Sequence, residues 1–198
     1  VLALRGDGTK NQHVFQPEKN GHSNASELVT QLKELGRGKY LDEDLKNNLA
    51  LDFCIGVAGY PEKHFEAPNK SQDLIYLKQK VDAGADYIVT QMFFDNKKYY
   101  SFVKKCREIG ITVPIIPGIK PINLINQLTV LPKIFSIDIP MELATELGKC
   151  KTNDAAGKVG TEWAIYQSRD LVANNAPSLH IYTYGVSDNV KEIVKAVF

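Results

Sequence analysis

Apolar segments with the length of β-strands alternate with amphipathic helical segments along the whole of this 198-residue chain. Strands joined by crossover helices imply a parallel sheet with right-handed connections, whose ligand-binding loops follow the C-terminal ends of the strands. The alternation therefore predicts one α/β domain, residues 1–198, with parallel strands and outer helices. Strands are expected at 1–4, 53–58, 86–93, 113–117 and 179–183, and helices at about 24–35, 71–83, 95–109, after a turn at 118–121, twice within 140–173, and at 188–197.

Local signals mark the ends of several helices. The residues Asn24 to Glu27 resemble a capping box, in which the first and fourth side chains satisfy free backbone amides. Gly84 and Gly110 follow two of the predicted helices, where glycine commonly ends a helix.

Chain length limits how much of a barrel can form. A complete (β/α)8 barrel usually needs about 250 residues, so 198 residues predict an incomplete (β/α)8 barrel of the TIM type. The segment Arg5-Gly6-Asp7 already ends the first strand, which suggests that the chain begins inside a domain. We therefore expect the sequence to be the C-terminal portion of a longer reading frame.

Composition argues against several classes of partner. With 24 basic and 23 acidic residues the formal net charge is +1, which favours neither nucleic acid nor an anionic membrane. The three cysteines, Cys54, Cys106 and Cys150, are too few and too widely spaced for a disulfide scaffold or a zinc site. Apolar stretches fall short of the roughly 18 residues of a membrane span. We expect a cytoplasmic protein without bound metal.

Four polar residues lie at or just after the C-terminal ends of the predicted strands and should share one rim of the barrel. They are Asp7, Tyr60, His64 and Gln91. An aspartate after a strand commonly caps a helix or turn, and a single histidine in a proline-rich loop is commonly a surface residue. Gln91 is harder to explain structurally, because its amide lies in an apolar segment and needs a ligand or a neighbouring strand as partner.

The residues alone do not define the chemistry. Asp73 and Lys80 lie two turns apart on one face of a predicted helix, where solvation alone would explain them. A glycine-rich nucleotide loop, a metal-ligand spacing and a nucleophile elbow are all missing from the sequence. The residues by themselves therefore indicate a ligand-binding α/β barrel of undefined chemistry.

Five ordered sequence blocks resemble the methylenetetrahydrofolate reductase family. The similarity extends from Leu4 to about Gln127, and beyond it the pattern His180-x-Tyr182-Thr183 is also similar. The blocks are Leu-Arg-Gly-Asp at 4–7, Gly-Tyr-Pro-Glu-x-His-x-Glu-Ala at 59–67, Lys-x-Lys-Val-Asp-Ala-Gly-Ala at 78–85, Thr-Gln-x-Phe-Phe-Asp at 90–95 and Ile-Pro-Gly-Ile at 116–119.

The resemblance implies a flavoprotein oxidoreductase of one-carbon metabolism and methionine biosynthesis. Such an enzyme uses FAD and NADH or NADPH to convert 5,10-methylenetetrahydrofolate to 5-methyltetrahydrofolate. Hydride passes from the nicotinamide to the flavin and then to the folate. A homo-oligomer is also expected for the longer protein.

The resemblance also implies roles for individual residues. Asp7 would lie beside the flavin and the pterin as the catalytic carboxylate, stabilising the cationic folate iminium. Gln91 and Gln127 would hydrogen-bond the pterin or the nicotinamide amide, and Asp7 would also contact substrate. The expected FAD-binding residues are Arg5, Gly6, Asp7, Asn24, Ala25, Tyr60, His64, Ala67, Asp73, Tyr76, Gln79 and Lys80.

Two departures from the family pattern leave other functions open. The family's N-terminal part, which holds a glutamate that protonates the folate, is not in this sequence. Where the family commonly has Leu-Asn-Arg after Thr183, this chain has Tyr184-Gly185-Val186, and Val186 cannot hold the folate by charge. The alternatives are a catalytically incompetent fragment, which the upstream reading frame would reveal, and a barrel lyase or methyltransferase without flavin, which would lack flavin absorbance.

Overall fold

The computed structural model describes residues 1–6, 8, 15–42, 44–183, 185 and 187–198. Its strands form a single parallel sheet in the order β1-β2-β3-β4-β5, and the predicted incomplete TIM-type barrel is confirmed. The strands are β1 (Leu2–Ala3), β2 (Gly56–Gly59), β3 (Tyr87–Met92), β4 (Ile115–Ile119) and β5 (His180–Ile181). The helices are α1 (Ala25–Gly36), α2 (Lys70–Asp82), α3 (Asn96–Glu108), α4 (Gln127–Phe135), α5 (Met141–Gly148), α6 (Asn153–Ala173) and α7 (Asp188–Val197).

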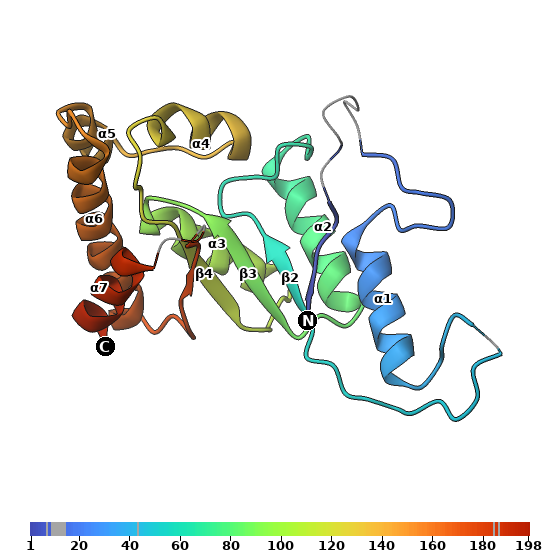
Figure 1. Ribbon diagram of the computed structural model, residues 1–198. Helices are drawn as coiled ribbons and strands as arrows, with labels where there is room; N and C mark the ends of the chain where they lie inside the picture. Colours follow the sequence, from blue (N-terminus) through green and yellow to red (C-terminus); the bar gives the residue numbers. More distant parts are fainter. Residues whose placement is uncertain (7, 9–14, 43, 184, 186) are drawn as a thin grey trace.

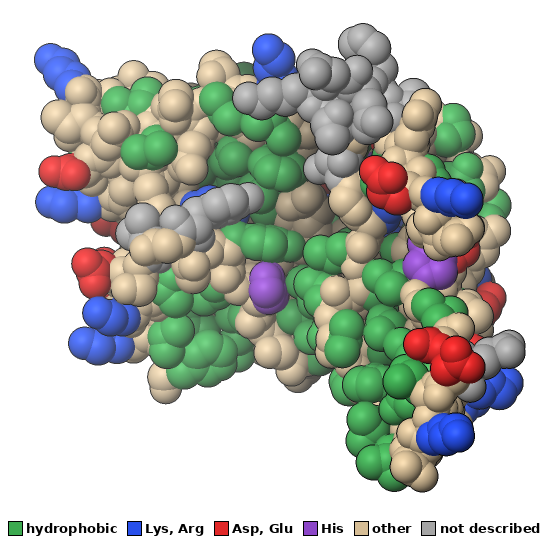
Figure 2. Space-filling model, turned by 45° about the vertical axis from the view of Figure 1, so that its right-hand side comes forward, with side chains coloured by type: hydrophobic (Ala, Val, Ile, Leu, Met, Phe, Trp, Pro, Cys, Tyr) green, Lys and Arg blue, Asp and Glu red, His purple; other side chains and the backbone are tan. Residues whose placement is uncertain are grey.

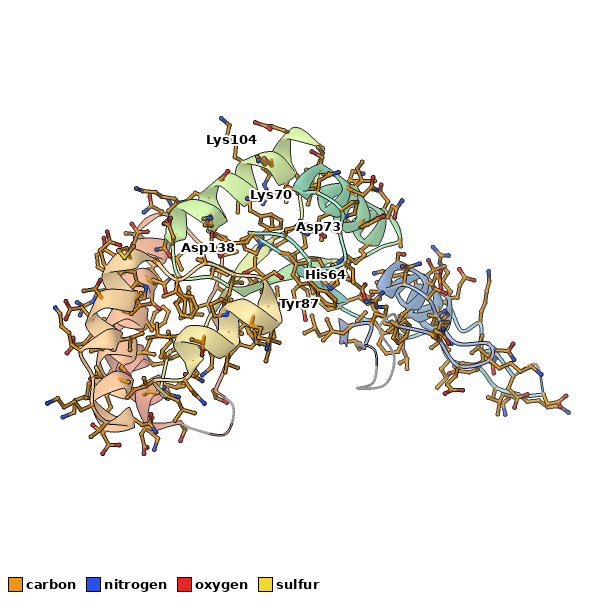
Figure 3. All side chains as sticks on the ribbon, turned by 90° about the horizontal axis from the view of Figure 1, so that it is seen from above. His64, Lys70, Asp73, Tyr87, Lys104 and Asp138 are labelled. Carbon is orange, nitrogen blue, oxygen red and sulfur yellow. The ribbon has the colours of Figure 1, made fainter. Side chains whose placement is uncertain are left out.

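The elements follow an arc rather than a closed ring. Helix α1 lies at one end of the molecule beside β1, whereas α6 and α7 lie at the other end (Figure 1). Seen from above, α1, α2, α3 and α6 succeed one another along the outside of this arc (Figure 3). Among the described residues β1 and β5 are the two edges of the sheet, so the barrel is open.

Several elements are shorter than predicted, because core residues at their ends do not join the hydrogen-bonded ladder. The expected strand 53–58 is regular only from Gly56. The Ile55 carbonyl accepts the Asp86 backbone amide at 2.7 Å, but the Ile55 amide donates to the Asp86 carboxylate at 2.8 Å rather than to a backbone carbonyl. The last strand is reduced to two residues, and the helix expected after the turn at 118–121 begins only at Gln127.

Two hydrophobic clusters build the interior. The larger one packs the strands against α1, α2, α3, α6 and α7, with Val57, Ile88 and Ile115 at its centre. The smaller one joins α4, α5 and α6 to the end of β3 through residues such as Met92 and Leu143. Helices α4 and α5 therefore rest over the C-terminal ends of the strands, where a barrel binds its ligands.

The end of β3 has an irregular register that places Gln91. The pairing of β3 with β4 shifts between Val89 and Met92. Within this interval the Gly118 amide donates to the Thr90 hydroxyl, and the Tyr182 hydroxyl donates to the Thr90 carbonyl, both at 2.9 Å. A Cβ on Gly118 would lie 2.3 Å from that carbonyl oxygen, so only glycine allows β4 to approach β3 here.

Two features are absent from the described residues. Across these residues we find no helix long and apolar enough to cross a membrane. The same part of the chain contains no cluster of three or more His, Cys, Asp or Glu side chains arranged to hold a metal ion.

Candidate functional site

Two adjacent cavities lie at the C-terminal ends of the strands. The first has a volume of about 340 Å³ and the second about 280 Å³. They share five lining residues, Leu4, Arg5, Ala58, Tyr60 and His64, which come from the ends of β1 and β2. Figure 2 shows hydrophobic side chains gathered across the middle of one face, with charged side chains mainly toward its periphery.

The first cavity brings together most of the residues expected to bind FAD. Gly6 is described but does not line this cavity, and Asp7 lies outside the described residues. The expected residues that line it are Arg5, Asn24, Ala25, Tyr60, His64, Ala67, Asp73, Tyr76, Gln79 and Lys80.

Helix α2 presents Asp73 and Lys80 to the first cavity from the same face. The Asn69 side chain caps this helix by accepting the Gln72 amide at 2.9 Å. One turn in, the Asp73 carboxylate accepts the His64 backbone amide at 2.9 Å, which fixes the loop after β2 to the helix. The two side chains, which solvation alone could explain in the sequence, are thus part of the cavity wall; Figure 3 shows Asp73 beside His64.

Lys80 is the cation of this cavity whose pKa differs most from its ordinary value. Its ammonium donates to the Ala58 carbonyl at 2.6 Å and lies 5.8 Å from the centre of the Tyr60 ring. Burial lowers the pKa of Lys80 to about 8, against the opposing attraction of Asp73. Within the described part of the chain no carboxylate lies within 4.0 Å of this ammonium, so its charge is incompletely compensated. Such a group is suited to bind an anion.

Arg5 and His64 complete the polar side of the first cavity. Arg5 forms an ion pair with Glu66, and its guanidinium lies 4.8 Å from the centre of the Phe15 ring. The His64 Nδ1 accepts the Glu66 backbone amide at 3.2 Å. Burial lowers the pKa of His64, so we expect a neutral imidazole at neutral pH.

The second cavity is more apolar and contains Gln91. Val89, Ile134 and Phe135 supply apolar walls, and His180 and Tyr182 close the side formed by β5 and the residue after it. The Gln91 side-chain oxygen accepts the Met92 backbone amide at 3.0 Å. Its nitrogen has no hydrogen-bond partner among the described residues, and its oxygen bonds to the next residue of the same strand. The Gln91 side chain is therefore not hydrogen-bonded to a neighbouring strand.

The structure does not bring Gln127 into either cavity. This residue begins α4, and its side-chain oxygen accepts the backbone amides of Asn123 and Leu124 at 2.8 and 3.2 Å. The contacts of its oxygen brace the turn before the helix.

Sequence reasoning missed several wall residues because their pattern is ordinary. Ile134 and Phe135 fit the apolar spacing of any amphipathic helix, and Phe65 lies in a polar loop. In the structure Phe65 and Ile134 are about half exposed, at 50% and 56%, although both are large hydrophobic residues. Exposed apolar surface beside polar groups is the signal of a binding site, and it becomes visible only in three dimensions.

Together, the fold and site define a barrel-type ligand-binding fold, with a polar cavity that contains the buried Lys80 and an apolar, amide-bearing cavity side by side at the strand ends. A family model described as "Methylenetetrahydrofolate reductase" matches residues 1–197. The chain therefore belongs to the methylenetetrahydrofolate reductase family of oxidoreductases, as the sequence blocks indicated.

Curated relatives agree with this membership. The chain is 40% identical over 196 residues to "Methylenetetrahydrofolate reductase (NADH) 1" of Arabidopsis thaliana, covering 94% of this chain and 31% of the relative. It is 38% identical over 202 residues to "Probable methylenetetrahydrofolate reductase (NADPH)" of Caenorhabditis elegans, covering 100% and 28%. For "5,10-methylenetetrahydrofolate reductase" of Pectobacterium carotovorum the identity is 34%, with coverage of 92% and 55%. The chain thus spans about a third of these eukaryotic relatives and about half of the bacterial one.

A solved structure shares the fold. It is described as "Uncharacterized protein from Clostridium thermocellum binds two copies of 5-methyl-5,6,7,8-tetrahydrofolic acid". The TM-score is 0.52 at 18% identity, over 74% of this chain and 53% of that one. At this identity the similarity shows the fold alone.

Proposed function

We propose that this chain forms the FAD-binding part of an enzyme that reduces 5,10-methylenetetrahydrofolate to 5-methyltetrahydrofolate with NADH or NADPH. The observation that supports this most is the gathering of ten expected FAD-binding residues around one cavity, with Lys80 incompletely compensated in its wall. The proposal places the enzyme in one-carbon and methionine metabolism in the cytoplasm. Self-association of the expressed protein is part of the same proposal.

The first cavity suits an elongated anionic cofactor. FAD has a central pyrophosphate, and Lys80 offers a buried cation in the cavity wall, together with the Arg5 guanidinium, which is paired with Glu66. The aromatic rings of Tyr60 and Tyr76 and the methyl group of Ala67 offer apolar contact for the flat parts of the cofactor. Asp73 offers an acceptor for a sugar hydroxyl. When bound, the flavin supplies hydride transfer between nicotinamide and folate.

The second cavity suits the flat ring of a substrate. The nitrogen of Gln91 is available to donate to a pterin or to a nicotinamide amide, and Phe135 offers an aromatic surface. Because the two cavities share Tyr60 and His64, a ring in the second lies next to a cofactor in the first. Gln127 contacts neither cavity here, so its substrate role rests on the family resemblance alone.

Asp7 has the catalytic role in this proposal, although it lies outside the described residues. A carboxylate near the reacting centre stabilises the cationic iminium that forms when the folate ring opens, so it favours reduction of the folate. The resemblance of Leu4 to Asp7 to the family motif supports this assignment.

The test uses the protein as the cell expresses it and two lysines of the same helix. Lys80→Met removes the buried cation of the first cavity, whereas Lys78→Met removes an ammonium that pairs with Asp82 on the surface. We expect the unmutated protein and Lys78→Met to purify with flavin absorbance and to oxidise NADH or NADPH when methylenetetrahydrofolate is added. Lys80→Met should bind FAD about 10- to 100-fold more weakly, the loss of one charge-assisted contact of about 1.5–3 kcal/mol.

Two results would contradict the proposal. One is an unmutated protein without flavin that still folds and binds added FAD no better than Lys80→Met. The other is a flavin-free lyase or methyl-transfer activity.

A further inference from the structure

Glu62 is a buried carboxylate that the proposed chemistry does not use. It lies in the loop between β2 and α2, two residues after Tyr60 and two before His64, and is 8% exposed. Both of its carboxylate oxygens accept the backbone amide of Asp138 at 3.1 Å. Lys98, in the first turn of α3, donates to Glu62 at 3.4 Å and to the Asp138 carboxylate at 3.0 Å.

The partner of Glu62 belongs to the segment that leaves α4. Asp138 lies three residues after Phe135, and Figure 3 shows it between α3 and α4. The intervening Ser136 has a left-handed backbone conformation with φ of 53°, and Ile137 is buried in the smaller hydrophobic cluster. The chain between Phe135 and Asp138 is therefore short and packed, so a displacement at Asp138 reaches the last turn of α4.

The loop end of this connection lines both cavities, and the α4 end lines only the second. Tyr60 and His64 are shared by both cavities, whereas Ile134 and Phe135 line only the second. The bond from Glu62 to Asp138 spans 76 positions in the sequence and joins the loop to the end of α4.

A charged group is an unexpected choice for a purely structural contact. Burial raises the pKa of Glu62, the Asp138 amide and Lys98 act against this effect, and the nearby Asp138 carboxylate adds to it. An apolar side chain would fill the same space without this cost. A carboxylate with two acceptor oxygens instead fixes the direction of a single backbone amide.

We propose that Glu62 is a positioning residue that holds the end of α4 at a set distance from the Tyr60–His64 loop. We call this contact between Glu62 and the Asp138 amide the brace. The identity of the ligands that it affects rests on the function proposed above, but the brace itself does not. Without Glu62 the loop keeps the bond from the His64 amide to Asp73 and the bond from Lys63 to the Ala67 carbonyl. Movement should therefore fall on the α4 side, so the second cavity loosens while the first keeps its shape.

The test compares four variants of the protein as it is expressed. Glu62→Ala removes the brace, and Glu62→Gln keeps one acceptor oxygen for the Asp138 amide without the charge. Lys98→Met removes only the ammonium. Lys97→Met is the control, because Lys97 is exposed and has no ion pair among the described residues.

We expect Glu62→Ala to raise the KM for methylenetetrahydrofolate and for the nicotinamide about tenfold, with FAD content and kcat within twofold of the unmutated protein. Glu62→Gln should restore most of this loss, Lys98→Met should have a smaller effect, and Lys97→Met none. Hydrogen exchange measured by mass spectrometry should become faster over residues 134–138 in Glu62→Ala but stay slow in Glu62→Gln.

Two outcomes would overturn the brace. One is unchanged exchange over residues 134–138 in Glu62→Ala. The other is a fall in melting temperature and kcat with unchanged KM values, which indicates a structural role only. If Glu62→Ala does not fold, Lys98→Met decides the question: faster exchange over residues 134–138 than in Lys97→Met supports the brace, and equal exchange in the two variants overturns it. Absence of turnover in the unmutated protein would contradict the proposed function, while the exchange measurement would still decide the brace.

Discussion

At the scale of single residues, Lys80 shows the clearest conflict between burial and charge. Its pKa is lowered from 10.5 to about 8, so the folded protein without ligand holds this proton less tightly than the unfolded chain does. A bound pyrophosphate would reverse that preference, because an anion beside the ammonium favours its charged form.

From Lys80 we predict that the stability of the ligand-free protein and its affinity for FAD change in opposite directions as the pH rises. Between pH 8 and 10.5 the unfolded chain binds more protons at this site, so the free energy of unfolding of the ligand-free protein should rise with pH. FAD affinity should fall over the same interval, because the cation is being lost. Urea titrations and fluorescence titrations with FAD at several pH values measure both trends.

The control is again Lys78 of α2. Lys78→Met should retain both trends. In Lys80→Met, neither the free energy of unfolding nor the FAD affinity should show the change with pH that Lys80 causes. Parallel pH curves for Lys80→Met and the unmutated protein would show that another group titrates.

Gln91 supplies the second prediction at this scale. Gln91→Leu removes the donor that faces the second cavity and the acceptor of the Met92 amide. We expect weaker binding of both the folate and the nicotinamide, by about 0.5–1.5 kcal/mol for each lost hydrogen bond, with FAD content unchanged. Both Michaelis constants, the flavin content and the melting temperature of this variant provide the comparison. Normal substrate constants in a destabilised protein would assign Gln91 to the support of β3 alone.

At the scale of elements, the close approach of α6 to the segment after β4 sets the position of the C-terminal half. A Cβ on Gly160 would lie 2.0 Å from the Ile122 carbonyl oxygen and 2.7 Å from the Ile122 nitrogen. Both contacts are with backbone, which cannot turn away as a side chain could. Gly160 therefore allows α6 to pack where a larger residue would push it outward.

We expect Gly160→Ala to destabilise the protein by about 1–3 kcal/mol or more, since overpacking against backbone forces the helix to move. Gly157→Ala, one turn earlier on the same helix, is the matched control because the nearest atom to its added Cβ is 4.0 Å away. The control should gain up to about 1 kcal/mol from helix propensity. Chemical denaturation of both variants separates crowding from propensity, and equal effects would contradict the packing argument.

The elements also show what a sequence can and cannot reveal. Helix ends at Asp95 and Gly84 were predictable, because the Asp95 side chain accepts the Lys97 amide and Gly84 has a φ of 115°. Strand lengths were less predictable from the sequence. The hydrophobic side chain of Ile55 indicates that this residue is buried, but it does not indicate whether its amide bonds to a strand or to the Asp86 side chain.

The candidate site, too, was only partly predictable from the sequence. Residues that follow strands, such as Tyr60 and His64, could be placed on the rim by topology alone. The role of α2 in the wall became an expectation only through the family resemblance, and the brace at Glu62 was not foreseen. A contact across 76 positions leaves no local periodicity in the sequence, so only the fold reveals it.

At the scale of the whole molecule, the open sheet limits how much of a cofactor this chain can enclose. The first cavity draws its walls from the ends of β1 and β2, the start of α1, and α2, and β1 is an edge of the sheet among the described residues. Its volume of about 340 Å³ is near the lower end of the roughly 300–1,000 Å³ typical of ligand pockets. FAD is larger than most ligands of such pockets, so part of it would extend beyond these walls.

We therefore expect a polypeptide of these 198 residues alone to bind FAD weakly, with a Kd of about 10 μM or higher, or about −7 kcal/mol or less favourable. Gel filtration should strip the flavin from it, and isothermal titration should still show weaker binding in Lys80→Met than in Lys78→Met, because Lys80 belongs to the part of the wall that this chain supplies. A longer polypeptide that continues the sheet beyond β1 should retain the cofactor through the same column, since walls that bury more of the ligand slow its release. Stoichiometric FAD carried through gel filtration by the 198-residue chain would mean that five strands already form a sufficient site, and would remove the argument that an open sheet limits binding.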